Sequence, residues 1–268
     1  MMNNNVKIQD PVNIEGIYAV FSTYVDDMIF SREKVNNPIF SGGIVKEVHS
    51  NVYNILINDL VGFISYIQNP NLMLSSNTII PIPEKEDFKL FAILPYASFA
   101  MKILRLVNPT LAHTILLLGD GWFFNLLKKI FELSGAEIIL LNISENLDTL
   151  NGKHIDSIIY SKSNPQISEI ISKLQPKHQI ELMAISYFDI GLDDPVYRKG
   201  IKYPYSYIRW DFKRNLEYFV NLVKQDNTLL DFFEVDIINV KGMDNIEQNI
   251  RNLKESSVYL FRKASDEH

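Results

Sequence analysis

The sequence has no cysteine among its 268 residues. Disulfide bonds and thiolate metal sites are therefore excluded, and a reducing compartment, the cytoplasm, is the expected location. The five histidines do not have the spacing of metal ligands, so no metal site is expected. The net charge of −6, from 26 basic and 32 acidic residues, argues against binding to nucleic acid or to an anionic membrane surface.

Long apolar runs are also missing. No run reaches the roughly 18 apolar residues that a membrane-spanning helix needs, so no membrane segment is expected. The opening residues, MMNNNVKIQDP, have neither the basic region nor the apolar core of a signal peptide. The hydrophobic fraction of 47% is nevertheless enough for a sizeable core. The length suits two modest domains or one large α/β unit.

The first third of the chain has the pattern of short strands. Apolar and β-branched residues predict strands at Gly16–Tyr24 and Ile44–Val48, after a loose leader that ends at Pro11. Two prolines keep Thr78–Pro83 extended and exclude a regular helix there. Strands this short and this closely spaced indicate a small β-barrel or sandwich.

The rest of the chain alternates helices and strands. Phe88–Val107 has a helical pattern, and Pro95 is expected to kink this helix or split it in two. Strands and helices then alternate from residue 113 to 186, which predicts a parallel sheet with right-handed crossovers. Further strands are expected at Tyr203–Trp210, Phe232–Val240 and Val258–Phe261.

A glycine turn lies at the centre of this alternation. The apolar run Ile115–Leu118 predicts a strand buried on both faces, and Gly119-Asp120-Gly121 follows it directly. Trp122–Ser134 is expected to be a helix that Gly135 terminates, and Ile138–Leu141 a second buried strand. Strand, glycine turn, helix and strand in this order are typical of the phosphate-binding start of a nucleotide-binding sheet.

The order of these elements resembles the medium-chain dehydrogenase/reductase superfamily, the zinc-type alcohol dehydrogenase-like proteins. The stretches that carry the resemblance are residues 78–104, 115–142, 154–186, 206–224 and 245–263. It implies an α/β fold, with a Rossmann-like doubly wound parallel sheet and a small, truncated GroES-like β-barrel domain. The implied domains are residues 1–100 with 231–268 for the GroES-like part and residues 101–230 for the Rossmann-like part.

The resemblance also implies a cofactor, NADP or NAD. Gly119, Gly121, Asn142 and Ser161 occupy the implied cofactor-binding positions. Two of the family's features are altered: Phe124 replaces the third glycine of G-x-G-x-x-G, and Asn142 replaces the acid that binds the ribose. Phe124 is expected to push the helix away or redirect its first turn, and a carboxylate at Asp120 is unfavourable for pyrophosphate if it points inward.

Zinc catalysis is not expected. The cysteine of zinc-dependent relatives has no counterpart near Asp26, and their Gly-His-Glu is replaced in residues 37–42. In the family's frame, Tyr24, Asp26 and Tyr96 are the candidate catalytic residues, as proton donors or acceptors. Each has a structural alternative, because Asp26 fits a solvated turn, Tyr24 a half-buried barrel position and Tyr96 core packing.

Two functions therefore stay open. The first is a zinc-independent, NAD(P)-dependent oxidoreductase that acts on a small organic carbonyl or alkene. The second is a degenerate, non-catalytic relative that serves as a binding or scaffolding subunit, with a protein or peptide partner in place of a small-molecule substrate. In either case the aromatic strand Tyr203–Trp210 fits the edge through which subunits of the family join, so a homodimer is expected.

Overall fold

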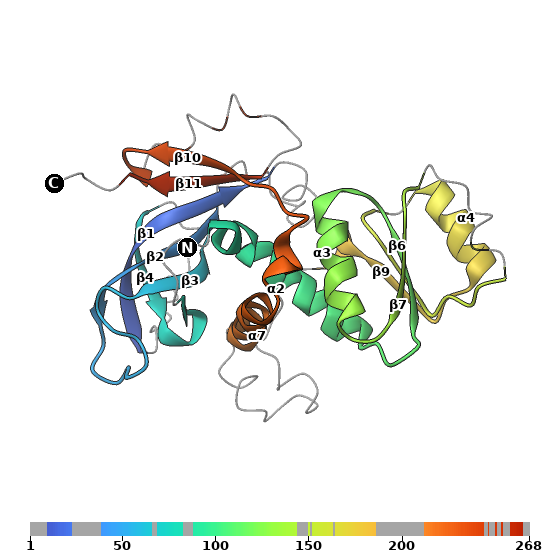
Figure 1. The fold of residues 1–268 in the computed structure, drawn as a ribbon, viewed down its shortest axis with the longest axis horizontal. Coiled ribbons are helices and arrows are strands. Elements are labelled where there is room, and N and C mark those ends of the chain that lie inside the picture. The colour runs from blue at the N-terminus through green and yellow to red at the C-terminus, as the bar shows by residue number, and fades with distance from the viewer. Residues whose placement is uncertain are drawn as a thin grey trace, which may run out of the picture.

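The computed structural model describes residues 10–22, 39–65, 69–82, 88–143, 150, 152–162, 164–185, 212–243, 246, 250, 253 and 258–264. Two sheets dominate this part of the chain, one at each end of the molecule, with helices between them (Figure 1). Several predicted features lie outside the described residues: the strand Tyr203–Trp210, and the candidate catalytic residues Tyr24 and Asp26.

The larger sheet has seven strands, and all of its described pairings except one are antiparallel. Its path runs β10-β11-β1-β2-β3-β5, and β4 pairs with β1. The strands are β1 (Pro11–Phe21), β2 (Ile39–Val48), β3 (Leu60–Ser65), β4 (Asn71–Ser75), β5 (Ile80–Pro81), β10 (Asp236–Val240) and β11 (Tyr259–Lys263). A 3-10 helix, η1 (Ser76–Thr78), precedes β5.

This sheet is built from both ends of the chain. Tyr18 to Phe21 of β1 pair antiparallel with β11, near the C-terminus. Two ion pairs join β1 to its neighbours, because Glu15 contacts Lys263 of β11 and, at 2.7 Å, Lys46 of β2. The lysines lower the pKa of the Glu15 carboxyl, Lys263 having the largest effect.

Strand β1 starts earlier than predicted. Pro11 belongs to the strand, where it pairs with Ser75 of β4, and is not the end of a leader. The physical reason is alternation, since Val12 and Ile14 are fully buried while their neighbours in sequence are not. A proline is tolerated at the first residue of a strand, where its missing N–H costs no ladder hydrogen bond.

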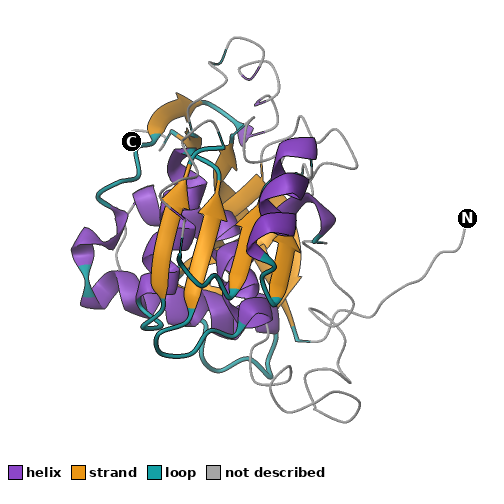
Figure 2. Ribbon diagram, turned by 90° about the vertical axis from the view of Figure 1, so that its right-hand side faces the viewer, coloured by secondary structure: helices purple, strands orange, loops and turns teal. Residues whose placement is uncertain are grey.

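The smaller sheet is the predicted parallel one. Its four strands are in the order β7-β6-β8-β9, and every described pair is parallel. They are β6 (Thr114–Leu118), β7 (Glu137–Leu141), β8 (Ser157–Tyr160) and β9 (His178–Glu181). Helix α3 (Gly121–Glu132) follows β6 and helix α4 (Pro165–Leu174) follows β8. The two helices lie on opposite faces of the sheet, which makes it doubly wound (Figures 1 and 2).

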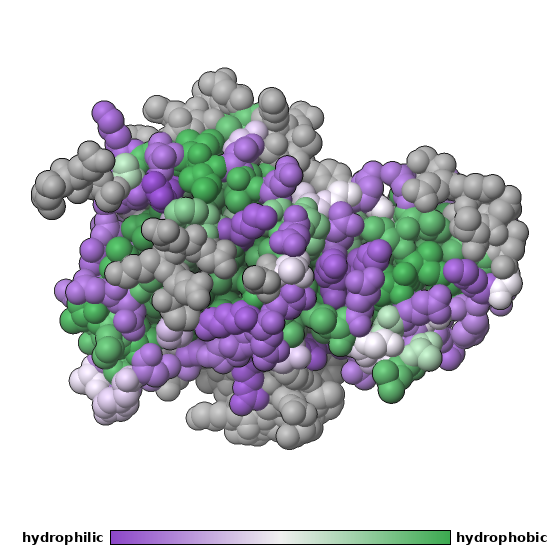
Figure 3. Space-filling view, viewed as in Figure 1, coloured by the Kyte–Doolittle hydropathy of each residue, from purple (hydrophilic) through white to green (hydrophobic). Residues whose placement is uncertain are grey.

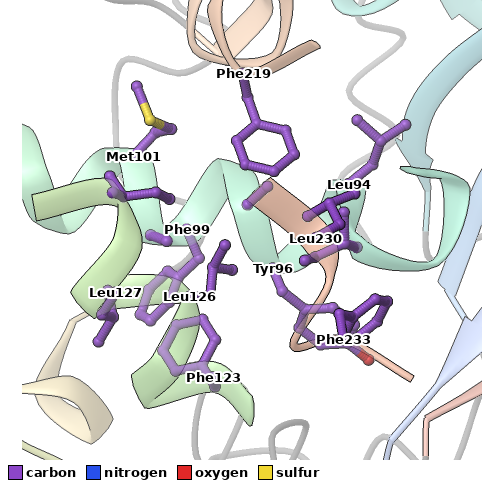
Figure 4. Packing of buried hydrophobic residues seen from close by; sticks show 14 of the residues in the cluster. Leu94, Tyr96, Phe99, Met101, Phe123, Leu126, Leu127, Phe219, Leu230 and Phe233 are labelled. Carbon is purple, nitrogen blue, oxygen red and sulfur yellow. The ribbon is translucent and has the colours of Figure 1, made fainter. Parts of the chain in front are cut away.

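Two long helices lie between the sheets. They are α2 (Phe88–Val107) and α7 (Phe212–Gln225), and two 3-10 helices, η3 (Leu182–Ala184) and η4 (Asn227–Leu230), complete the described set. Figure 4 shows α2 passing between α3 and α7, with side chains from all three helices in contact. One hydrophobic cluster runs from Tyr18 and Ile39 of the first sheet, through α2, to Ile115 and Leu117 of the second.

Helix α2 excludes one of the two outcomes predicted for Pro95. It is continuous from Phe88 to Val107, so Pro95 does not split it. By length and composition α2 could span a membrane, but 83% of its most apolar window is buried inside the protein. A helix that is apolar all round is typical of a core element, and dense burial holds this one together across the proline.

Candidate cofactor site

The parallel sheet brings the predicted cofactor residues together. Gly119 directly follows β6, Asn142 follows β7 and Ser161 follows β8. Because these three strands are adjacent and parallel, their carboxyl ends meet at one edge of the sheet. In doubly wound sheets this edge is where ligands bind. Gly121, the fourth predicted residue, opens helix α3 at the same edge.

The glycine turn has the geometry of a strand-to-helix turn. The Gly119 N–H donates to the Leu141 carbonyl at 2.9 Å, which ties the turn to the end of β7. Asp120 is extended, and Gly121 has a φ of 81°, a left-handed value that glycine adopts without strain. Asp120, at the capping position, makes no side-chain hydrogen bond to the N–H groups of α3. A helix start of this kind is suited to an anion.

Phe124 occupies the place of the family's third glycine and is fully buried. A β-carbon added at Gly119 would overlap the Phe124 ring. The absence of a side chain at Gly119 therefore makes room for the Phe124 ring. Helix α3 begins directly after the turn, at Gly121, with Phe124 in its first turn. Gly119 thus has a packing role toward Phe124 that the sequence pattern did not reveal.

Asp120 and Asn142 form a pair at the exposed edge. The Asn142 Nδ2 donates to Asp120 Oδ2 at 2.8 Å. The carboxylate that the sequence analysis regarded as a hindrance to pyrophosphate is held toward the end of β7. There the family places its ribose-binding acid. The hydrogen bond therefore places the Asp120 carboxylate beside Asn142, the residue that replaces the family's ribose-binding acid.

An aromatic cluster lies next to the first turn of α3. Trp122 is partly buried and packs edge-on against Tyr96 of α2, with ring centroids 4.9 Å apart. The Trp122 ring is also 5.0 Å from Phe233. Tyr96, a candidate catalytic residue, is fully buried in this cluster (Figure 4). Its core-packing role is therefore observed, and its role in proton transfer stays a prediction.

Ser161, Gln166 and Tyr160 complete the described edge. The Ser161 carbonyl accepts from Met183 N–H at 3.0 Å, and Gln166 Nε2 donates to the Ile143 carbonyl at 2.8 Å. Burial, and after it the negative charge of Glu181, raises the pKa of the Tyr160 hydroxyl. The phenol therefore stays protonated at neutral pH.

The amino ends of the same strands carry a different set of polar groups. Asp156 accepts from the Thr114 N–H at 3.0 Å and from Lys177 Nζ at 3.2 Å, and His113 Nε2 lies 3.0 Å from the hydroxyl of the buried Ser157. The Thr114 N–H contributes most to a lowered pKa of the Asp156 carboxyl, ahead of Lys177 and against the effect of burial. These contacts fasten β6, β8 and the start of β9 together.

Metal ligands were not expected. Within the described ranges, no group of three or more His, Cys, Asp or Glu side chains is placed to hold a metal ion. Sequence reasoning passed over Ser41, which lies in the region that replaces the family's Gly-His-Glu. Ser41 is fully buried on β2, beside a register shift, and its hydroxyl has no hydrogen-bond partner among the described residues. Only its burial in the three-dimensional structure identifies Ser41 as a polar group without a partner among the described residues.

Comparison by sequence finds little. No protein-family model matches the chain, and no curated protein matches it.

Comparison by structure finds many similar folds. An alcohol dehydrogenase zinc-binding domain protein from Burkholderia ambifaria aligns with a TM-score of 0.65 at 12% identity, over 96% of this chain and 93% of that one. The quinone oxidoreductase from Coxiella burnetii aligns with a TM-score of 0.57 at 14% identity, over 96% and 92%. CAD from Helicobacter pylori, complexed with NADP(H), aligns with a TM-score of 0.58 at 14% identity, over 95% and 91%.

These similarities extend over nearly the whole of each chain, and they include both sheets in the order that the sequence predicted. At such low identity they establish the fold and not the reaction. The chain has the fold of the medium-chain dehydrogenase/reductase superfamily.

Proposed function

We propose that this protein is a zinc-independent, NAD(P)-dependent oxidoreductase that acts on a small organic carbonyl or alkene. One observation carries the proposal: the carboxyl edge of the parallel sheet keeps a glycine turn and a helix start without a side-chain cap, beside an exposed Asp120–Asn142 pair. The structural neighbours include a quinone oxidoreductase, a 2-haloacrylate reductase and a protein complexed with NADP(H), which supports the same class of reaction.

The start of α3 is the proposed phosphate-binding site. Backbone N–H groups at a helix start favour negative charge, through hydrogen bonding and the helix dipole. Asp120 does not occupy this place, because its carboxylate accepts from Asn142 instead. Gly121, which is exposed, lets the backbone of the turn approach a pyrophosphate closely.

The Asp120–Asn142 pair is the proposed ribose site. A carboxylate accepts hydrogen bonds from a ribose diol, whereas it repels the additional phosphate of NADP. Asp120 therefore takes over the part of the acid that the sequence lacks at Asn142. The pair favours NAD over NADP, and Ser161, at the end of the adjacent strand β8, extends the same edge.

The reaction that we propose transfers a hydride between the bound nicotinamide and the substrate. A proton has to move as well, and Tyr24, Asp26 and Tyr96 are the proposed groups for it. Tyr24 and Asp26 lie outside the described residues. Tyr96 is fully buried against Trp122 in this structure, so its hydroxyl would have to become accessible before it could donate to a substrate.

Trp122 gives a direct test, because it lies in the first turn of α3. Titration with NADH and with NADPH is expected to quench its fluorescence, with tighter binding of NADH. Asp120→Asn is expected to weaken NADH binding about tenfold or more, since a hydrogen bond to a charged group is worth roughly 1.5–3 kcal/mol. Asp236→Asn, an exposed change on β10 of the other sheet, is the control and should leave the affinity unchanged.

A second function remains, that of a non-catalytic binding or scaffolding subunit with a protein or peptide partner. The aromatic cluster of Tyr96, Trp122 and Phe233 favours it, because these rings fill space directly beside the start of α3. The same titration separates the two. If millimolar NADH and NADPH produce neither quenching nor a shift in melting temperature, the oxidoreductase proposal is wrong and this second function replaces it.

A further inference from the structure

Strand β7 is an edge strand of unusual character. Among the described strands it has a neighbour on one side only, namely β6. Doubly wound dinucleotide sheets have a third strand at this position, in the order 3-2-1-4-5-6. Here the described order is β7-β6-β8-β9, which in chain order is 2-1-3-4, and no described strand lies beyond β7.

The sequence of β7 offers no protection against strand pairing. Its five residues are Glu137-Ile138-Ile139-Leu140-Leu141, and the four apolar residues are all partly exposed. Edge strands usually carry lysine, proline, a bulge or inward-pointing charge that prevents pairing with another chain. The strand at the other end of the described order, β9, has the polar sequence His178-Gln179-Ile180-Glu181. Of these two strands, β7 is the more apolar.

The backbone of β7 shows which groups face outward. The Glu137 N–H donates to the His113 carbonyl, and the Leu141 carbonyl accepts from the Gly119 N–H, both at 2.9 Å. Because backbone polar groups alternate sides along a strand, Glu137, Ile139 and Leu141 face β6. Ile138 and Leu140 therefore direct their N–H and C=O groups away from β6, to the side where no described strand lies.

We propose that two copies of this chain pair through β7, antiparallel about a twofold axis at Ile139, so that two four-stranded sheets join into one. A twofold axis perpendicular to the sheet keeps each side chain on its own face, so residues pair when their numbers add up to 278. Ile139 then meets Ile139 of the second copy, and Ile138 meets Leu140.

This register satisfies the outward backbone groups. Ile138 and Leu140 become hydrogen-bonded pairs across the axis, and each copy contributes two N–H and two C=O groups, which makes four hydrogen bonds. The charges also agree with it. Glu137, the only charged residue of β7, lies at one end of each strand, so the two carboxylates are placed at opposite ends of the new ladder rather than against each other.

Apolar surface continues beyond the strand. Leu133 and Leu111 are 54% and 83% exposed, and both lie at the amino end of β7, where Leu111 is packed beside Gly135. Figure 3 shows apolar side chains gathered over the β6–β7 side of the parallel sheet. A second copy would cover this surface with its own.

Charge exchange at the axis tests the pairing. Ile139→Lys and Ile139→Glu each place two like charges in contact across the axis, so either variant alone is expected to dimerise about tenfold or more weakly than the original protein, measured by sedimentation over a concentration series. An equal mixture of the two variants is expected to restore the dimer, because lysine then meets glutamate. Ile237→Lys, the same change on the exposed edge strand β10, is the matched control and should have no effect.

Several outcomes would overturn the proposal. One is a protein that stays monomeric throughout the series, and another is a dimer that neither Ile139 variant weakens. A mixture that stays monomeric, while each variant keeps its circular dichroism spectrum, would also do so. Hydrogen exchange on the unmodified protein gives a test without mutation: the amides of Ile138 and Leu140 should exchange more slowly as concentration rises, and equal exchange at all concentrations would contradict pairing through β7.

Discussion

Helices α3 and α4 both leave the carboxyl edge of the parallel sheet, but they begin differently. At α4, Asn164 accepts from the Ile167 N–H at 2.8 Å, and Pro165 occupies the first helical position. At α3, Asp120 stands at the capping position and makes no such bond, since its carboxylate accepts from Asn142. One helix start is completed by its own side chains, and the other is not.

The presence of a cap at α4 and its absence at α3 have different consequences for folding stability and for ligand binding. Capping satisfies N–H groups that a helix start otherwise leaves without partners, and it typically stabilises a protein by about 1 kcal/mol. The side chain of Asn164 supplies this stabilisation at α4, whereas the side chain of Asp120 does not supply it at α3. Forgoing it is useful where a ligand supplies the missing acceptor, which is why the α3 end of the edge, with its glycine turn, is the better candidate for a phosphate site.

The largest expected effect comes from the packing beneath the α3 turn. Phe124→Ala should lower the free energy of unfolding by about 3–5 kcal/mol, because it empties a fully buried site. Gly119→Ala should cost about 1–3 kcal/mol through overlap with the Phe124 ring. The double variant should lose less than the sum of the two, measured by urea denaturation. Strict additivity would show that Gly119 and Phe124 do not depend on each other.

A smaller effect is expected at the amino ends of β6 and β8, where Asp156 meets Thr114. Asp156→Ala leaves the Thr114 N–H without its acceptor and should cost about 1–3 kcal/mol. Because the pKa of Asp156 is lowered in the folded state, its stabilisation is complete above the unfolded pKa of about 3.9 and is lost as the pH falls through the folded value.

The pH dependence can be measured directly. Urea midpoints below about pH 4 should fall more steeply with decreasing pH for the original protein than for Asp156→Asn, which has no carboxyl to protonate. Parallel curves for the two proteins would show that Asp156 does not have the lowered pKa.

The smallest effects sharpen the comparison of the helix starts. Asn164→Ala removes a cap and should cost about 1 kcal/mol, whereas Asp120→Ala removes none and should change the free energy of unfolding by less than about 0.5 kcal/mol. Both are measured by urea denaturation without cofactor. An equal loss at the two positions would mean that Asp120 stabilises α3 after all.

Much of the fold could be predicted from local pattern. The apolar run at Ile115–Leu118, the glycine turn and the terminating Gly135, whose φ is 79°, locate β6, α3 and β7 to within a few residues. The helix Phe88–Val107 was predicted with its observed bounds. Apolar residues that recur along the sequence predict which residues are buried, and in these elements the buried residues are numerous enough for the pattern to be recognised.

The site was harder to predict. The positions of Gly119, Gly121, Asn142 and Ser161 at one edge follow from a parallel sheet, which the sequence did indicate. The Asp120–Asn142 bond did not follow, because it joins residues 22 positions apart whose meeting depends on the β6–β7 register. Whether Pro95 would kink α2 or split it was also left open, since the packing around a helix is not visible in its own sequence.

The sequence by itself determined the order of the elements, the glycine turn and the alternation that makes a doubly wound sheet, because these depend on residues that are near one another in the chain. Only the tertiary structure decided that the Phe124 ring fits beneath Gly119, that Asp120 reaches Asn142, and that β7 ends the order of the described strands with the backbone groups of Ile138 and Leu140 facing away from β6. Each of these depends on which strand lies beside which, and that is fixed by burial of the whole core rather than by any single segment.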